Sequence, residues 1–324
     1  MRDDAPVSAV ADGCVDARGA ASAGTPPVGE SHDRAPLATR ALNLTAIALP
    51  FAGFVAAIAL LWGWGFSWLH LGLLLGGYLL TAIGVTVGYH RLFTHKSFET
   101  NAVVRAILGV LGSMAVEGPI LRWVATHRSH HQHSDRDDDP HSPNTHGDGL
   151  WALMRGLYHA HVGWLFTASP KLDRYVPDLQ SDSVVRWVSR LFPLWAALGL
   201  IIPGGIALAI TGTWSGALLG LIWGGLARVF LVHHATWSIN SVCHLWGTRP
   251  FDCHDHSRNN VLFGIVGLGE GWHNNHHAFP SSARHGLRWW QIDASYLVIR
   301  GLALVGLARN IRIPSPERIA AKRR

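Results

Sequence analysis

Hydrophobic residues gather in four long runs that polar segments separate. The runs cover residues 44–62, 69–88, 191–211 and 214–232, and the first three contain no Asp, Glu, Lys or Arg. Each run approaches the ~20 residues that a helix needs to cross a bilayer. Arg228 is the one charged residue within the fourth run. The pattern therefore predicts an all-α integral membrane protein with four transmembrane helices.

The short connections between the runs predict two helical hairpins. Residues 63–68 join the first pair of runs and residues 212–213 join the second pair, and none of the 27 Lys and Arg residues lies in either connection. Positively charged loops stay on the cytosolic side of a membrane. We therefore expect a multi-pass protein with both termini in the cytosol, where the remaining segments form a helical cap.

The segments outside the runs divide the chain into three parts. Residues 1–40 are rich in Ala, Gly, Pro, Ser and Asp without apolar periodicity, and we expect a disordered tail there. Residues 41–310 form the membrane domain, and residues 311–324 form a basic C-terminal tail. Helical periodicity over residues 103–114 and 293–309 predicts two shorter helices, with Asp293 as an N-cap.

Composition narrows the class of protein further. Hydrophobic residues make up 48% of the chain and charged residues 15%, which excludes a disordered protein. The net charge of +6 could indicate nucleic-acid binding, but the membrane topology already accounts for the distribution of Lys and Arg. We therefore expect no nucleic-acid partner.

The chain contains 21 histidines, and their spacing is the most specific signal in the sequence. His90 and His95 form an H-x4-H motif where the second run ends, and two H-x2-HH motifs and a single histidine after the fourth run follow. The candidate ligands are His90, His95, His127, His130, His131, His244, His273, His276 and His277.

The spacing of these motifs has a geometric meaning. On an α-helix, positions i, i+3 and i+4 share one face, so each H-x2-HH motif is expected to aim three imidazoles at one place. Positions i and i+5 point about 140° apart on an α-helix. The helix must therefore end or bend between His90 and His95 if both bind one centre.

Nine imidazoles exceed the roughly four to six ligands that one transition metal accepts, so the clusters predict a dimetal centre in the cytosolic cap. Bound imidazoles need hydrogen-bond acceptors for their second ring nitrogen, and Asp139 and Glu270 are candidates. Isolated histidines at a membrane interface need no metal-binding role. We leave the following ones in that class: His32, His70, His146, His254, His256 and His285.

The strings HRLFTH, HRSHH, NSVCH and GEGWHNNHH, in this order around the predicted hairpins, resemble those of the membrane-bound acyl-CoA Δ9 desaturases, the stearoyl-CoA desaturase family. The resemblance extends from about residue 69 to residue 290. It implies a di-iron centre with two Fe2+ ions held by the nine histidines, with Asn240 near one ion through water. It also implies O2-dependent formation of a cis double bond at carbon 9 of a saturated long-chain acyl-CoA.

Other residues are assigned roles by the same resemblance or by their position. Trp123 and Trp237 are candidates for the wall of an acyl tunnel, and Lys171 and Arg174 for head-group contacts. Tyr78, twelve residues before His90, is a candidate for the closed end that limits chain length. The chain contains no H-P-G-G haem-binding segment, so we expect electrons from a separate donor, a ferredoxin or flavin reductase system or cytochrome b5.

Three alternatives remain open. Ala125 and Thr126 stand where the family often has a basic and an acidic residue, which favours an acyl-lipid substrate as one alternative. A related di-iron hydroxylase of alkanes or lipids is the second, although its first motif is usually H-x3-H. A metal transporter with histidine-rich loops is the third, and it would require ionisable groups at mid-membrane.

Overall fold

The computed structural model describes residues 34–61, 63 and 65–324, so residues 1–33 of the predicted tail lie outside the described part. The protein is almost entirely helical within this part. Its elements in chain order are α1 (Leu37–Leu60), α2 (Trp68–Ile83), η1 (Gly84–Thr94), β1 (Glu99–Thr100), α3 (Ala102–Ser113), α4 (Ile120–His133), α5 (Leu150–His161), η2 (Gly163–Phe166), α6 (Leu172–Tyr175), α7 (Pro177–Gln180), α8 (Ser183–Arg190), α9 (Phe192–Thr211), α10 (Trp214–Gly220), η3 (Leu221–Ala227), α11 (Arg228–Ser241), η4 (Val242–His244), α12 (Val261–Val266), α13 (His273–Ala278), α14 (Ala294–Leu304), β2 (Ala308–Arg309) and α15 (Pro316–Lys322).

Within the described residues, four helical segments are long and apolar enough to cross a membrane, as the hydrophobic runs predict. They cover Leu37–Leu60, Trp68–Thr94, Phe192–Thr211 and Trp214–His244. The second and fourth extend well beyond the runs at 69–88 and 214–232. Their polar ends carry His90 and His244.

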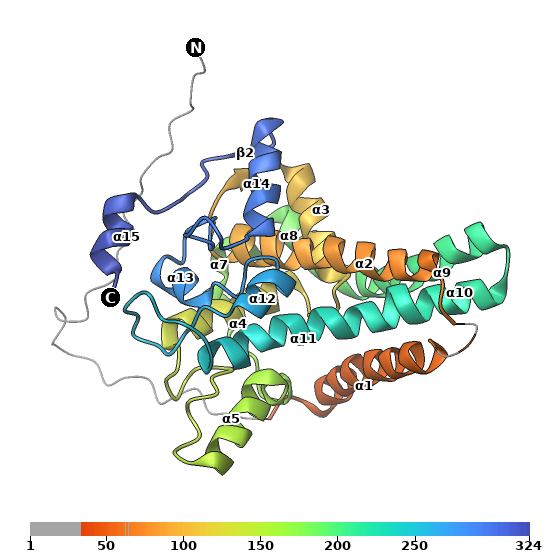
Figure 1. The fold of residues 1–324 in the computed structure, drawn as a ribbon, viewed down its shortest axis with the longest axis horizontal. Helices are drawn as coiled ribbons and strands as arrows, with labels where there is room; N and C mark the ends of the chain where they lie inside the picture. The colour runs from red at the N-terminus through yellow and green to blue at the C-terminus, as the bar shows by residue number, and fades with distance from the viewer. Residues whose placement is uncertain (1–33, 62, 64) are drawn as a thin grey trace.

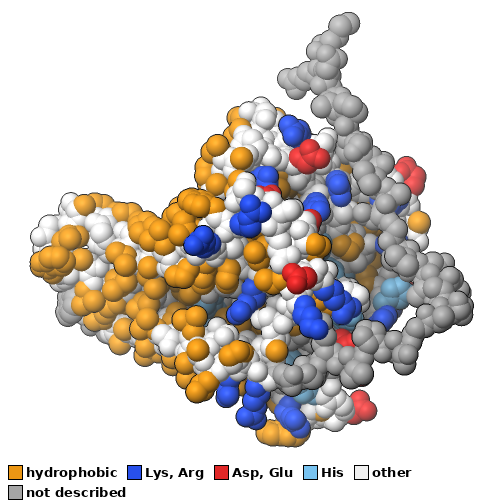
Figure 2. All heavy atoms as spheres, turned by 180° about the vertical axis from the view of Figure 1, so that it is seen from behind, with side chains coloured by type: hydrophobic (Ala, Val, Ile, Leu, Met, Phe, Trp, Pro, Cys, Tyr) orange, Lys and Arg blue, Asp and Glu red, His pale blue; other side chains and the backbone are white. Residues whose placement is uncertain are grey.

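The four long segments lie lengthwise beside one another and extend to one end of the molecule (Figure 1). Helices α4, α12, α13 and α15 gather at the other end. Apolar side chains cover the elongated end, whereas Lys, Arg, Asp and Glu concentrate on the opposite half (Figure 2). Exposed residues such as Leu79, Ile201 and Trp214 lie on the elongated end, where a bilayer would surround them.

The two shorter predicted helices are present as α3 and α14. Asn101 accepts a hydrogen bond from the Val104 amide at the start of α3, and Asp293 accepts one from the Tyr296 amide at the start of α14. Asp293 is therefore an N-cap, as predicted. The antiparallel pair β1–β2 joins the segment before α3 to the segment after α14, with Glu99 opposite Arg309.

Arg228 connects three of the helices inside the bundle. Its guanidinium is fully buried and donates hydrogen bonds to the carbonyl oxygens of Gly224, Met114 and Gly199, at 3.2, 2.7 and 2.6 Å. A charged group in an apolar bundle is costly unless polar atoms surround it. These carbonyls lie on α11's own segment, after α3 and within α9, so Arg228 fixes the turn that follows α3.

Candidate metal centre

The first histidine pair is positioned by a change in helix type. Helix α2 continues as the π-helix η1 over Gly84–Thr94, and the His95 amide donates to the His90 carbonyl oxygen at 3.1 Å. A π-helix bonds i to i+5, so its turn is longer than that of an α-helix. The His90 and His95 rings therefore lie with centroids 4.8 Å apart, and the wider turn brings together two side chains that an α-helix would separate.

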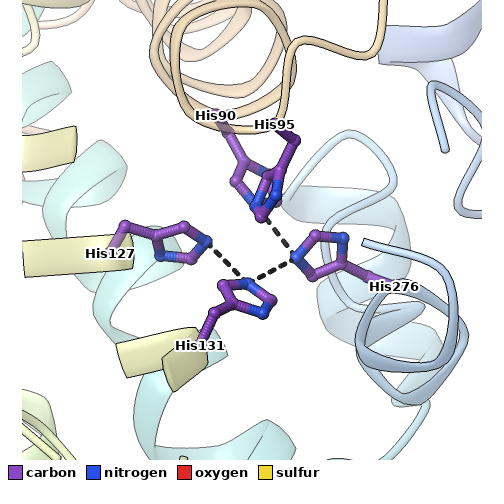
Figure 3. A group of neighbouring side chains, drawn as sticks. All are labelled: His90, His95, His127, His131 and His276. Carbon is purple, nitrogen blue, oxygen red and sulfur yellow. Dashed lines mark hydrogen bonds between the residues drawn. The ribbon is translucent and has the colours of Figure 1, made fainter. Parts of the chain in front are cut away.

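Five histidines form one candidate site (Figure 3), called here the five-histidine site. Their ligand nitrogens all lie within 4.8 Å of one another. The Nε2 atom of His276 lies 3.1 Å from Nε2 of His90 and 2.9 Å from Nε2 of His131, which lies 3.1 Å from Nε2 of His127. The set comprises His90, His95, His127, His131 and His276.

Four further histidines form a second candidate site, the four-histidine site. It comprises His130, His244, His273 and His277. The Nε2 atom of His273 lies 3.0 Å from Nε2 of His244 and 3.1 Å from Nε2 of His277. The rings of His131 and His277 stack with centroids 4.5 Å apart, so the two sites adjoin.

The expectation that each H-x2-HH motif aims three imidazoles at one place is wrong. On α4, His127 and His131 enter the five-histidine site, while His130 enters the other site. On α13 the arrangement is reversed, because His273 and His277 enter the four-histidine site and His276 the other. The i and i+4 side chains of each helix share one site, and the i+3 side chain reaches the neighbouring one.

Buried carboxylates orient the imidazoles from behind. Nδ1 of His90 lies 2.5 Å from a Glu270 carboxylate oxygen, and Nδ1 of His130 lies 2.9 Å from an Asp139 carboxylate oxygen. Likewise, Nδ1 of His244 lies 2.9 Å from an Asp135 oxygen, and Nδ1 of His277 lies 2.7 Å from an Asp255 oxygen. An Nδ1–H group donating to a carboxylate leaves the Nε2 lone pair directed into the site.

The electrostatics of both sites fit a bound cation. Burial, and then repulsion by neighbouring histidines, holds the pKa of His127, His131, His273 and His276 well below the usual value, so these rings are neutral. Burial opposes ionisation of Asp139, but His130 and hydrogen bonds lower its pKa to about 2.

Hydrogen bonding among the rings cannot satisfy all of these nitrogens. The single Nε2 atom of His273 faces Nε2 of both His244 and His277. Among the residues that the structure describes, the buried Nε2 atoms of His95 and His130 have no hydrogen-bond partner. Converging lone pairs repel one another unless a cation lies between them. The donor set, all imidazole nitrogen with carboxylates behind it, suits a transition metal in each site.

Comparison with known proteins agrees with this geometry. The model of the family described as "Fatty acid desaturase" matches residues 66–304. The chain belongs to the fatty acid desaturase family. Members of this family use a di-iron site, and the histidine-rich cluster supplies residues that could hold one.

Three relatives illustrate the range of activities in the family. The chain is 45% identical over 278 residues to a hex-5-enoyl-[acyl-carrier protein] acetylenase of Moorena producens (strain JHB), covering 85% of this chain and 87% of the relative. It is 39% identical to an sn-1 stearoyl-lipid 9-desaturase of Anabaena variabilis, covering 76% and 86%. It is 38% identical to Delta-9 acyl-lipid desaturase 1 of Arabidopsis thaliana, covering 81% of each chain.

A cavity of about 520 Å³ adjoins both sites, and its wall includes His90, His127 and His273. Four of the residues singled out from the sequence, Tyr78, Trp123, Trp237 and Asn240, also line it. The Trp123 ring stacks on His127 with centroids 5.1 Å apart. The apolar wall therefore leads directly to the ligands of both candidate sites.

The two predicted head-group residues lie outside this wall. Lys171 and Arg174 are exposed and do not line the cavity, although Ser169 and Pro170 do. The Arg174 guanidinium instead lies over the Tyr175 ring at 5.1 Å. Arg122, which sequence reasoning did not single out, lines the cavity and is exposed.

Sequence reasoning also missed several groups around the histidines. Asp255 orients His277 and lies apart from the histidine motifs in the sequence. Asp135 lies just after the second histidine cluster, but it orients His244, which is 109 positions away. His285 was left as an interface histidine, yet it is buried, and its Nδ1 atom accepts a hydrogen bond from the Arg91 guanidinium at 2.9 Å. Arg91 also pairs with Glu270 at 2.7 Å, so a charged network backs His90.

Glu117 also lines the cavity, and no sequence motif pointed to it. The Trp123 indole Nε1 donates to its carboxylate at 3.0 Å. Burial raises the pKa of Glu117 to about 7, although hydrogen bonds from Thr236 and Trp123 oppose the shift. The carboxyl is therefore neutral over much of the mildly acidic range.

Replacing His130 by Ala removes a ligand from the four-histidine site. We expect purified protein to fall from about two bound metal ions per chain toward one, because nine ligands divide between two sites. Metal analysis of the purified chain measures this change. His254→Ala is the matched control, since His254 is exposed and lies outside both sites, and it should keep the wild-type content. Unchanged metal content in His130→Ala would contradict the assignment.

Glu117 predicts a pH dependence of stability with a definite sign. Its pKa is raised from the ordinary 4.5 to about 7 in the folded protein, so folding favours the protonated form. This contribution is complete below pH 4.5 and is lost as pH rises through 7. The melting temperature of wild type relative to Glu117→Gln should therefore fall between pH 5 and pH 8. Parallel pH profiles for the two proteins would refute the prediction.

Proposed function

We propose that the protein is an O2-dependent desaturase that introduces a cis double bond at carbon 9 of a saturated long-chain acyl group. Two Fe2+ ions and electrons from a separate donor protein complete the activity. The observation that carries the proposal is the shared wall, since one apolar cavity touches ligands of both histidine sites. An acyl chain inside it would lie against the metal centre.

The cavity residues would bind and orient the substrate. Methylene groups offer no hydrogen-bonding handle, so position along the chain depends on the shape of an apolar tunnel and on its fixed ends. Trp123 and Trp237 would form the tunnel walls beside His127 and His273. When bound, the iron ions supply the O2 chemistry that breaks unactivated C–H bonds.

The nine histidines hold the ions in this proposal, with Asn240 near one of them through water. Asp139 and Glu270 would keep the Nδ1 protons of His130 and His90 in place, so that Nε2 faces the metal. The buried surroundings would exclude bulk water from the reacting part of the chain.

The proposal also concerns the head group that carries the acyl chain. An acyl-CoA substrate is the expectation from the motifs, but relatives named as acyl-lipid desaturases support an acyl lipid. Ala125 and Thr126 are buried and uncharged, so neither offers a positive charge to a phosphate. Among the cavity residues that the structure describes, Arg122 supplies the cationic side chain, and we place the head group beside it.

The orientation in the membrane follows from the charge distribution. Arg and Lys residues are concentrated around the histidine sites, away from the apolar end (Figure 2). Because positively charged segments tend to stay in the cytosol, this distribution supports an orientation with the metal centre and both termini on the cytosolic side. A cytosolic donor of electrons could reach the sites from that side, and a basic surface favours an acidic partner.

Expression in a bacterial strain without its own Δ9 desaturase tests the reaction. With a ferredoxin and its reductase supplied, fatty-acid analysis should reveal monounsaturated chains with the double bond at carbon 9. Labelled stearoyl-CoA and labelled stearoyl phospholipid, given separately to isolated membranes, distinguish the two head groups. An alcohol as the only product would identify a hydroxylase instead. The inactive His130→Ala protein is the control for endogenous activity.

The relative from Moorena producens supports a second candidate. Its name assigns it an acetylenase activity on an unsaturated acyl group carried by acyl carrier protein. By analogy, this chain could convert an existing double bond to a triple bond. Supplying the same strain with monounsaturated acyl chains tests this candidate, because an acetylenic product would be formed only if the second candidate is correct.

Tyr78 is proposed to close the far end of the tunnel. Its hydroxyl donates to the Val266 carbonyl oxygen at 2.6 Å, which joins α2 to α12 at the cavity wall. Removing the ring in Tyr78→Ala should lengthen the space and shift the preference among C14 to C20 substrates toward longer chains. Tyr78→Phe keeps the ring and should retain the wild-type preference. An unchanged product distribution in Tyr78→Ala would exclude this role.

A further inference from the structure

The C-terminal segment lies against the short helix that carries three of the metal-site histidines (Figure 1). The Lys322 Nζ atom donates to the carbonyl oxygen of Ala278, the last residue of α13, at 2.7 Å. It also lies 5.1 Å from the centre of the Phe279 ring. A cation at this point satisfies a carbonyl that the helix end leaves free and complements the helix dipole.

The same segment pairs with a distant loop. Arg323 lies opposite Phe251 in an antiparallel bridge. The Asp252 amide donates to the Lys322 carbonyl oxygen at 3.3 Å, and the Arg324 amide donates to the Pro250 carbonyl oxygen at 3.0 Å. Residues 322–324 therefore form a short strap across residues 250–252.

This loop continues directly to Asp255, whose carboxylate lies 2.7 Å from Nδ1 of His277. The Arg249 guanidinium donates to the Asp255 carbonyl oxygen at 2.5 Å, which folds the loop back on itself. The hydrogen bond between Asp255 and His277 thus joins the loop to α13. The strap joins the same two pieces of chain a second time, through Ala278 and the 250–252 backbone.

Apolar packing supports the strap from the side of α15. Phe251, Ala278 and Phe279 form a buried cluster, against which Ile319 packs. The cluster contains side chains of the loop, of α13 and of the C-terminal helix. Neither the loop nor the six-residue helix α13 is long enough to hold its own conformation without such contacts.

We propose that Lys322, together with the strap of residues 322–324, is a positioning element that aligns Asp255 with His277 and so shapes the four-histidine site for its metal ion. The inference rests on the metal binding within the proposed function, but not on the substrate or the reaction. Lys322 acts through α13 and the loop and contacts neither metal nor substrate. Loss of Lys322 should lower the affinity of the four-histidine site for its ion and leave the other site unchanged, because the strap supports Asp255 and His277.

Co2+ titration of the purified full-length chain in detergent tests the proposal by absorption spectroscopy. Wild type should bind two ions per chain. Lys322→Met should weaken one of them ~10–100-fold, the usual effect of disturbing an outer-shell partner, and leave the other unchanged. Lys322→Arg should restore binding. Arg300→Met is the matched control, since it removes an exposed cation that lies outside the strap and both sites, and this variant should bind both ions normally.

Asp255→Asn identifies the affected ion. The double variant Lys322→Met, Asp255→Asn should bind no more weakly than Asp255→Asn alone, because both changes act on one alignment. A chain that ends at residue 321 removes the whole strap and must show the same selective loss. Two wild-type affinities in Lys322→Met or in the shortened chain, or equal weakening of both ions, would overturn the proposal. Failure to form a desaturated product in cells would bear only on the proposed function.

Discussion

The structure depends on holding imidazoles with their Nε2 atoms directed at common points. Each such arrangement is repulsive without a cation, and flexible side chains would turn away from it. Two features prevent this. The histidines project from helices, which restrict their rotamers, and buried carboxylates hold the Nδ1 protons of His90, His130, His244 and His277. The segments packed around the two sites hold those carboxylates in place.

The division of the two H-x2-HH motifs makes the two sites interdependent. Helix α4 contributes two ligands to the five-histidine site and one to the other, and α13 does the reverse. A shift of either helix along its axis would therefore disturb both sites at once. The stacked rings of His131 and His277 lie where the sites adjoin. This arrangement keeps the spacing between the sites nearly as rigid as the spacing within a helix.

Sequence alone predicted what local spacing determines. The four apolar runs, the N-cap at Asp293 and the nine clustered histidines follow from periodicity and composition, which are local properties of the chain. The H-x4-H motif required an end or a bend in the helix, and the structure satisfies it with the π-helix η1 and an end at Thr94. The sequence pattern cannot specify the number of residues per helical turn, and it is the wider π-helical turn that brings His90 and His95 together.

Long-range pairings could not be predicted in this way. Asp135 contacts His244 across 109 positions and Arg91 contacts His285 across 194, and no periodicity links such residues. Proximity in sequence to a histidine cluster pointed to Asp139 and Glu270 but did not identify every partner, because Asp139 contacts the nearby His130 whereas Glu270 contacts the distant His90. Lys171 and Arg174 were placed by motif position, whereas access to the cavity depends on how the loop after η2 folds.

The cavity and the sites also constrain each other, and this limits what substitutions can change. Trp123 touches the metal sites through His127 and the cavity's polar edge through Glu117, so one side chain serves both. Two residues hold the turn that carries Glu117. Arg228 donates a hydrogen bond to the Met114 carbonyl oxygen. The His233 Nε2 atom lies 3.0 and 3.2 Å from the carbonyl oxygens of Ala115 and Val116. Membrane-embedded residues therefore position the wall against which an acyl chain would lie. One continuous set of contacts therefore runs from the interior of the helix bundle to the histidine ligands. These contacts would determine how far an acyl chain enters the cavity and how closely it approaches the histidines.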